Sequence, residues 1–255
     1  MATSEAPVRI RFVLVRTSHP GNIGAAARAI RTMGFARLVL VAPKRYPDPE
    51  VQALAAGADD VLERIALAPD LVAAVADCRL VLGLSARRRG VALPEYAPRA
   101  AAVEAQAAAA RGDEVALVFG NERTGLENDE LKRCHAMVRI PSVDDFGSLN
   151  LAQAVQVMAY ELRLAGLEVP PAPPRPRDPP ATAAEMEAFF GHLAVTLDDI
   201  DFHKGRSPRT ILQRLRKLFM RAQPDSRELR VLRGILSDAQ RMARRAHAAG
   251  EPPPG

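Results

Sequence analysis

The chain has 255 residues, of which 48% are hydrophobic and 25% are charged. This composition is typical of a globular protein and excludes collagen, a coiled coil and a chain that is disordered throughout. No apolar stretch reaches the ~20 residues of a membrane span, and residues 1–7 lack the apolar core of a signal peptide. Two cysteines, Cys78 and Cys134, are too few for a disulfide framework, so we expect a cytoplasmic protein.

The formal net charge of +5 is unevenly distributed along the chain. Residues 202–247 hold thirteen basic and three acidic side chains, a net charge of +10, which leaves −5 for the rest. An acidic body joined to a basic segment indicates that the segment binds a polyanion such as nucleic acid. The alternative is a solvated helix face in an arginine-rich sequence.

Strands and helices are expected to alternate in the first 168 residues. Apolar runs predict five strands, at residues 9–15, 38–41, 80–84, 115–119 and 136–140. The segments between them predict helices at residues 22–33, 56–64, 70–76 and 99–110, a short helix from Asn128 and a long one at 149–164. Apolar strands separated by helices predict an α/β fold, a parallel sheet covered on both faces.

A proline-rich spacer separates this part from a second, helical part. Seven of the twelve residues at 169–180 are proline, which predicts a semi-rigid linker. The sequence therefore predicts a first domain at 1–168, a small all-α domain of about three helices at 181–247 and a disordered tail at 248–255.

The helices of the all-α domain have recognisable starts. Thr182 and Glu185 form a capping-box pattern, Ser207 precedes a proline at the first helical position, and Asp225 or Ser226 caps the third helix. The second helix is expected to bury one apolar face, made of Ile211, Leu212, Leu215, Leu218 and Phe219. Its opposite side carries four basic residues, Arg209, Arg216, Lys217 and Arg221.

Three polar turns lie where helices begin or strands end. Residues 21–24 (GNIG) open the first helix, residues 119–126 (FGNERTGL) follow the fourth strand, and residues 147–151 (GSLNL) lead into the long helix. Open α/β sheets bind ligands at the carboxyl ends of their strands. Taken singly, each turn is explained by local capping, for example by Ser148 or Asn121. Three such turns in this order favour a ligand-binding site. A dinucleotide site is disfavoured, because the full G-x-G-x-x-G motif is absent.

Other catalytic patterns are weak. The sequence contains no Walker A loop, H-E-x-x-H or paired C-x-x-C motif, so no metal is expected. Ser18 and His19 could form a nucleophile and its base, but no Asp is placed to orient the histidine. Cys134 and His135 stand isolated and are interpreted as structural residues at a strand edge.

The three turns carry a resemblance to a known family. Residues 22–28 (NIGAAAR), residues 119–126, and residues 148–162 (SLNLAQAVQVMAYEL) after Ile140-Pro141 resemble the three motifs of the SPOUT RNA methyltransferases. Within that superfamily they resemble the SpoU/TrmH class of ribose 2′-O-methyltransferases.

The resemblance extends to most of the chain outside the spacer and the ends. Residues 11–34, 54–62 and 217–236 resemble the branch of the class that methylates tRNA at position 32 of the anticodon loop. It implies a C-terminal trefoil knot in the α/β domain, a homodimer formed through the knot helices, S-adenosylmethionine as cofactor and tRNA as partner.

The resemblance also implies functions for individual residues. Motif positions around the reacting ribose are matched by Asn22, Arg28, Glu122, Ser148 and Asn150. The cofactor pocket is matched by Leu84, Ser85, Ala86, Gly120, Asn121, Ile140, Gly147, Ser148 and Leu149. Leu84 and Asn121 depart from the family pattern, which often has Thr and Arg there. Contacts with tRNA are expected from Arg209, Arg216, Lys217 and Arg221.

The implied reaction transfers a methyl group from a sulfonium to the 2′-hydroxyl of cytidine or uridine 32. Arg28 is expected to clamp the phosphate and the developing alkoxide, because a pKa above ~12 makes arginine a poor base. A phosphate oxygen or Ser148 would relay the proton. The alternatives are a ribosomal-RNA ribose 2′-O-methyltransferase of the same class and a non-catalytic RNA-binding protein that has kept the fold.

Overall fold

The computed structural model describes residues 9–86, 93–143, 147–168, 179–204 and 207–249. The chain divides into two compact units, at residues 1–175 and 176–255. Most of the expected spacer and of the expected tail lies outside the described residues. No helix in the described part of the chain is long and apolar enough to cross a membrane.

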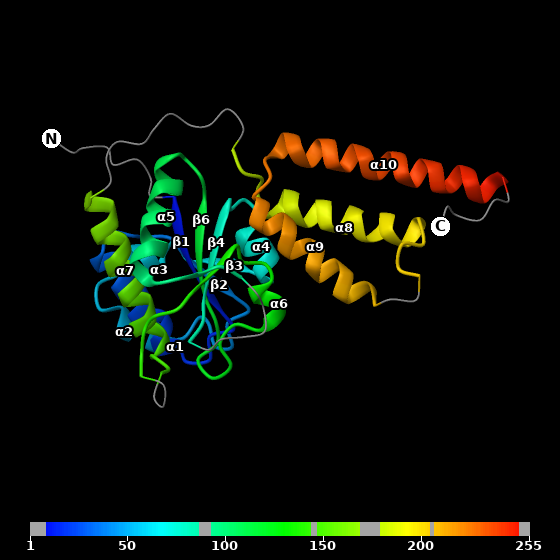
Figure 1. The fold of residues 1–255 in the computed structure, drawn as a ribbon. Helices are drawn as coiled ribbons and strands as arrows, with labels where there is room; N and C mark the ends of the chain where they lie inside the picture. Colours follow the sequence, from blue (N-terminus) through cyan, green and yellow to red (C-terminus); the bar gives the residue numbers. More distant parts are fainter. Residues whose placement is uncertain (1–8, 87–92, 144–146, 169–178, 205–206, 250–255) are drawn as a thin grey trace. The chain divides into compact units, whose positions relative to one another are not determined.

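The first unit is built on a parallel sheet (Figure 1). Its strands in the described residues are β1 (Ile10–Val15), β2 (Leu38–Val41), β3 (Ala66–Ala68), β4 (Leu80–Leu84), β5 (Glu95–Tyr96), β6 (Val115–Phe119) and β7 (Ala136–Val138). They lie in the order β3-β2-β1-β6-β4-β7-β5, and every neighbouring pair is parallel. The expected α/β fold with a parallel sheet is thus confirmed. The trefoil knot, which strand pairing alone does not establish, stays a prediction.

Helices cover both faces of this sheet. One face packs against α1 (Pro20–Thr32), α2 (Pro49–Ala55), α5 (Pro98–Ala110) and α7 (Leu151–Glu168), which lie together on one side of the sheet in Figure 1. The other face meets α4 (Leu71–Val75) and α6 (Asn128–Leu131), while α3 (Asp59–Leu62) packs beside α1 and α2. All six residues of β1 are buried, because side chains on both faces are covered. This burial explains the continuous apolar runs in the sequence.

The structure corrects several expected boundaries. The helix expected at 56–64 is absent as such, because Ala56 is left-handed (φ 43°) and Gly57 follows at φ 89°, so α2 ends before them and α3 starts after them. The short edge strands β3 and β5 were not expected. The strand expected at 136–140 ends at Val138. The long helix begins at Leu151 rather than 149, because Asn150 caps it.

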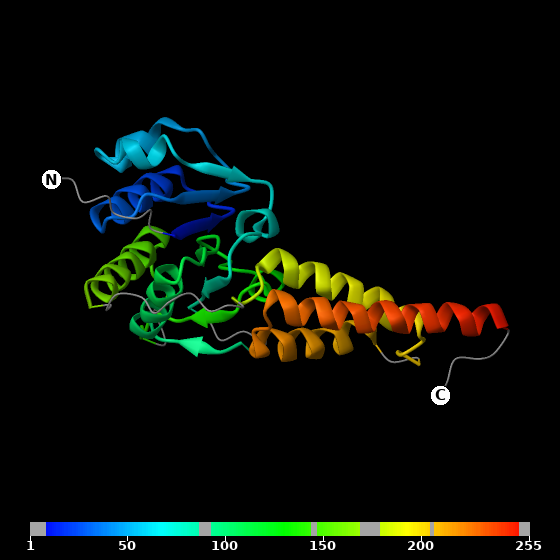
Figure 2. The same cartoon turned by 90° about the horizontal axis from the view of Figure 1, so that it is seen from above.

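The second unit consists of α8 (Ala183–Asp199), α9 (Pro208–Ala222) and α10 (Ser226–Ala249), which Figure 2 shows side by side. The rings of Phe189, Phe190 and Phe219 meet in its core. The capping box of Thr182 and Glu185 that the sequence predicts is confirmed. The expectation that Leu218 is buried is wrong, because its side chain is 46% exposed.

The other caps expected in this unit differ from one another. Asp225 Oδ1 accepts hydrogen bonds from the backbone N–H groups of Arg227 and Glu228, so of the two predicted caps, Asp225 and Ser226, it is Asp225 that caps α10. Ser207 stands at the N-cap position of α9, but its side chain makes no capping hydrogen bond within the described residues. Pro208 at the first turn has a backbone φ suited to a helix start and carries no N–H that would need a partner.

Candidate active site

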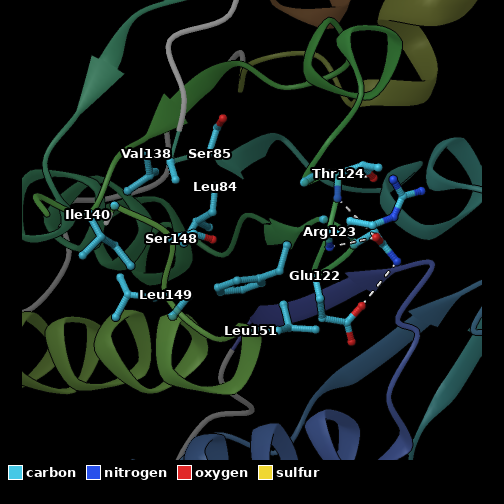
Figure 3. Close-up of a pocket in the computed structure, with 17 residues that line it drawn as sticks. Leu84, Ser85, Glu122, Arg123, Thr124, Val138, Ile140, Ser148, Leu149 and Leu151 are labelled. Atoms are coloured by element: carbon cyan, nitrogen blue, oxygen red, sulfur yellow. Dashed lines mark hydrogen bonds between the residues drawn. The ribbon is translucent and has the colours of Figure 1, made fainter. Parts of the chain in front are cut away.

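A pocket of about 420 Å³ lies at the carboxyl ends of β4, β6 and β7 (Figure 3). This volume is within the range of pockets that hold small molecules. All nine residues that the resemblance implies for the cofactor line it: Leu84, Ser85, Ala86, Gly120, Asn121, Ile140, Gly147, Ser148 and Leu149. Three parts of the chain that are far apart in the sequence, at residues 84–86, 120–121 and 140–149, therefore contribute to one cavity.

Other residues that the sequence did not predict also line the pocket. Besides Glu122, which was expected near the ribose, the additional residues are Phe119, Arg123, Thr124, Gly125, Val138, Leu151 and Ala154. Four of these lie within the 119–126 turn, so the motif itself was the available signal. The others are strand and helix residues, and only the packing of β7 and α7 brings them to the cavity.

The pocket has two chemically different ends. Figure 3 shows Val138, Ile140 and Leu149 at one end and Glu122 and Arg123 at the other. The first group offers an apolar surface suited to a flat ring system. The second offers charged groups beside exposed backbone. An elongated ligand with an apolar and a polar part fits such a cavity.

The 119–126 turn is held closed by its own backbone and by Asn121. A Cβ on Gly120 would lie 2.1 Å from the backbone nitrogen of Leu126, so only glycine fits there. Asn121 is 7% exposed, and its Nδ2 donates to the Arg16 carbonyl and to Ser18 Oγ, both at 2.7 Å. Asn121 therefore joins this turn to the end of β1. The family pattern often has arginine at this position, whereas here the side chain is a buried amide that makes hydrogen bonds within the protein.

Glu122 is bound by several N–H donors. Its carboxylate accepts hydrogen bonds from the backbone N–H of Ser18 at 2.9 Å, the backbone N–H of His19 at 3.2 Å and Asn22 Nδ2 at 3.0 Å. Burial raises the pKa of Glu122, but these hydrogen bonds together outweigh it and hold the pKa below its ordinary value. Glu122 is therefore an ionised acceptor that fixes the entrance to α1.

A chain of hydrogen bonds links Glu122 to the start of α7. Asn150 Oδ1 accepts from the backbone N–H of Ala152 at 2.9 Å and so caps α7, which leaves Asn150 Nδ2 to donate to Asn22 Oδ1 at 2.9 Å. Asn22 in turn donates to Glu122. Because each amide uses its oxygen and its nitrogen in defined roles, three of the five residues expected around the ribose form one oriented network.

The remaining two residues expected around the ribose lie apart from this network. Ser148 is exposed and lines the pocket. Arg28 is exposed on α1, six residues after Asn22, which is about 240° around the helix. Arg28 does not line the pocket, so its position suits a contact with a second large molecule better than a contact with a ligand inside the cavity.

The second unit contains the four basic residues expected to contact RNA. Arg209, Lys217 and Arg221 are exposed on α9. Arg216 differs, because its two Nη atoms pair with the two carboxylate oxygens of Glu187 at 2.6 and 2.8 Å and its guanidinium lies 4.2 Å from the centre of the Phe190 ring. Arg216 is therefore already engaged within the helical unit.

The weaker sequence patterns have structural explanations. The backbone N–H groups of Ser18 and His19 donate to the carboxylate of Glu122, so this pair helps to hold Glu122 in place. His135 Nδ1 accepts from the backbone N–H of Val81 at 3.0 Å, and burial lowers the pKa of His135 to about 4. Burial raises the pKa of Cys134 to about 12, so this thiol is not reactive. No group of metal-binding side chains occurs within the described residues.

Two segments of the chain match known protein families. Residues 9–160 match the SpoU rRNA methylase family, and residues 184–248 match the C-terminal domain of the tRNA methyltransferase TrmJ. The chain belongs to the TrmJ branch of the SpoU methylases. The two matched segments fall in the two compact units of the structure, one in each.

Several TrmJ proteins are similar over nearly their whole length. The tRNA (cytidine/uridine/adenosine-2′-O-)-methyltransferase TrmJ of Pseudomonas aeruginosa is 44% identical over 245 residues, which cover 92% of this chain and 95% of that protein. The tRNA (cytidine/uridine-2′-O-)-methyltransferase TrmJ of Pectobacterium atrosepticum is 46% identical over 234 residues, 91% of this chain and 97% of its own. The crystal structure of TrmJ from Z. mobilis ZM4 superposes with a TM-score of 0.78 at 37% identity, and the match covers 89% of this chain and 97% of that one.

Proposed function

We propose that this chain uses S-adenosylmethionine to methylate the ribose 2′-hydroxyl of cytidine or uridine at position 32 of the tRNA anticodon loop. The observation that carries the proposal is the pocket, whose polar end joins the oriented network of Asn22, Glu122 and Asn150. The names of the TrmJ relatives support tRNA as the substrate. Position 32 comes from the resemblance of the motifs.

The residues of the pocket fit S-adenosylmethionine. Leu84, Ile140 and Leu149 offer the apolar surface that the adenine ring needs, and the pocket volume of about 420 Å³ is sufficient for a molecule of this class. The turn at 119–126 exposes backbone beside Glu122 for the polar part of the molecule. When bound, S-adenosylmethionine supplies an electrophilic methyl group on a positively charged sulfur.

The residues of the chain act mainly by placing the ribose and stabilising charge. Glu122 holds Asn22 in one orientation, and Asn150 holds it from the other side, so the amide groups next to Glu122 are ordered before RNA arrives. Ser148 is exposed in the pocket lining, where its hydroxyl can relay the proton of the 2′-hydroxyl to a phosphate oxygen, which accepts it. Arg28 contributes positive charge to the RNA from outside the pocket.

The helical unit would add affinity for tRNA. Arg209, Lys217 and Arg221 are exposed cations on α9, and cations of this kind bind phosphates without reading sequence. We further propose that two copies of the chain associate through α7, which exposes Tyr160 by 49% and Leu167 by 67%. Sedimentation of the full chain as a monomer would contradict the dimer.

Methyl transfer to total tRNA and to ribosomal RNA tests the proposal. We expect labelled methyl from S-adenosylmethionine to enter tRNA, and nuclease digestion with mass spectrometry to locate it on the ribose at position 32. Labelling of ribosomal RNA alone would support the alternative substrate. Binding of S-adenosylmethionine without transfer to any RNA would support the non-catalytic alternative.

A further inference from the structure

The polar end of the pocket contains a cation to which the motif resemblance gives no function. Arg123 lies in the 119–126 turn and is the only basic residue among the described residues that line the pocket. Its side chain is exposed. In Figure 3 it lies at the same end as Glu122 and away from Ile140 and Leu149. The cation therefore faces solvent beside the part of the pocket where the ribose is proposed to lie.

The backbone of Arg123 is held firmly. Asn121 Oδ1 accepts hydrogen bonds from the backbone N–H of Arg123 at 3.0 Å and of Thr124 at 3.3 Å, and Asn121 is itself buried. The base of the Arg123 side chain is thus fixed, while its guanidinium stays accessible. An anchored arginine loses less conformational freedom on binding than one in a loose loop.

The charge of Arg123 is not neutralised by the adjacent acid. Glu122 already accepts hydrogen bonds from Ser18, His19 and Asn22. Within the described residues no carboxylate forms an ion pair with Arg123. A free guanidinium beside an occupied carboxylate is suited to a multivalent anion from outside, and its planar set of donors matches a phosphate.

We propose that Arg123 binds a phosphate of the RNA substrate next to the target ribose. The inference rests on the proposed function, because a ribose at the network of Asn22 and Glu122 carries a phosphate on either side. Arg123 would then hold the RNA at the mouth of the pocket, while the exposed cations of α9 act on other phosphates. The competing anion is the carboxylate of S-adenosylmethionine, which would need Arg123 to turn inward.

The test compares R123A and R123K with a matched control, R64A, in the full chain. Arg64 is exposed and precedes β3, the edge strand that β2 and β1 separate from β6. R64A therefore removes the same charge as R123A, but away from the pocket. Calorimetry measures the Kd for S-adenosylmethionine. Filter binding measures the Kd for a tRNA transcript at several salt concentrations, since affinity for phosphates depends on salt.

For R123A we expect a tRNA Kd at least fivefold weaker at 0.15 M salt, a salt slope smaller by roughly 0.7–0.9, and an S-adenosylmethionine Kd within twofold of wild type. R123K should lie between R123A and wild type, and R64A should equal wild type. An unchanged tRNA Kd and slope in R123A would overturn the proposal. So would a cofactor Kd weakened fivefold with tRNA binding intact. A wild-type chain that methylates no tRNA would instead contradict the proposed function, and the proposal with it.

Discussion

Replacing Glu122 with glutamine removes a charge from the centre of the hydrogen-bond network without changing its size. Glutamine keeps one acceptor oxygen for His19, Asn22 and the longer, 3.1 Å hydrogen bond of Ser18. Its amide nitrogen would replace the other carboxylate oxygen, which now accepts from Ser18 at 2.9 Å and from Asn121 Nδ2 at 3.3 Å, so the shorter bond of Ser18 is lost. Loss of that charge-assisted bond costs ~2 kcal/mol, and the weaker remaining bonds add ~1 kcal/mol. If the network orients the ribose, a loss of about 3 kcal/mol lowers kcat roughly 100-fold.

The assay is single-turnover methyl transfer to tRNA, with cofactor affinity measured in parallel. E127Q is the matched control, because Glu127 follows the same turn and its side chain is 62% exposed. We expect E127Q to behave as wild type and E122Q to bind S-adenosylmethionine but transfer methyl slowly. Turnover by E122Q within twofold of wild type would refute the idea that the Glu122 network positions the substrate.

Three further predictions test other parts of the molecule. R28A should lose nearly all turnover yet bind S-adenosylmethionine normally, because Arg28 lies outside the pocket lining, and calorimetry with a transfer assay checks both. Since burial lowers the pKa of His135 to about 4, the unfolded state takes up this proton first as pH falls, so wild type should lose about 2 kcal/mol of stability between pH 7 and pH 4.5. H135N keeps an acceptor for the N–H of Val81 and should lose less in urea unfolding; equal losses would argue against this explanation. R216A should lower the unfolding free energy of the helical unit by about 1–2 kcal/mol, whereas K217A should weaken tRNA binding and leave the melting temperature unchanged, because only Arg216 is engaged with α8.

The central strands were predictable because they are covered on both faces. The apolar runs of β6 and of residues 12–15 in β1 exist because every residue in them is buried. The edge strand β3 has no such run, since two of its three residues are exposed, and β5 has only two residues. Such strands form because a neighbour offers hydrogen bonds, which leaves no periodic signal in the sequence.

At the break between α2 and α3, the sequence contains a residue that ends the helix, but the helix propensity of its neighbours outweighed it. The alanines around Ala56 favour a helix, yet Ala56 and Gly57 both adopt positive φ and end α2. Gly57 was the visible cue. Helix propensity summed over the segment concealed it, because propensity is a weak guide where a single residue ends the helix.

The site could be predicted by position but not by contact. The resemblance named nine of the residues that line the pocket, but it could not show that Asn121 is buried and hydrogen-bonded or that Arg28 lies outside the cavity. Arg216 illustrates the same limit. The sequence places Arg216 and Lys217 together on the basic side of α9, but it does not show that Arg216 has partners on α8. Partners distant in sequence decide which charges remain free.

The most direct test of the central claim uses two tRNA transcripts that differ at one atom. One carries the ordinary ribose at position 32, and the other carries a 2′-deoxyribose there. If the chain methylates the 2′-hydroxyl at position 32, methyl from S-adenosylmethionine should enter the first transcript and not the second. Equal incorporation into both transcripts would contradict the account.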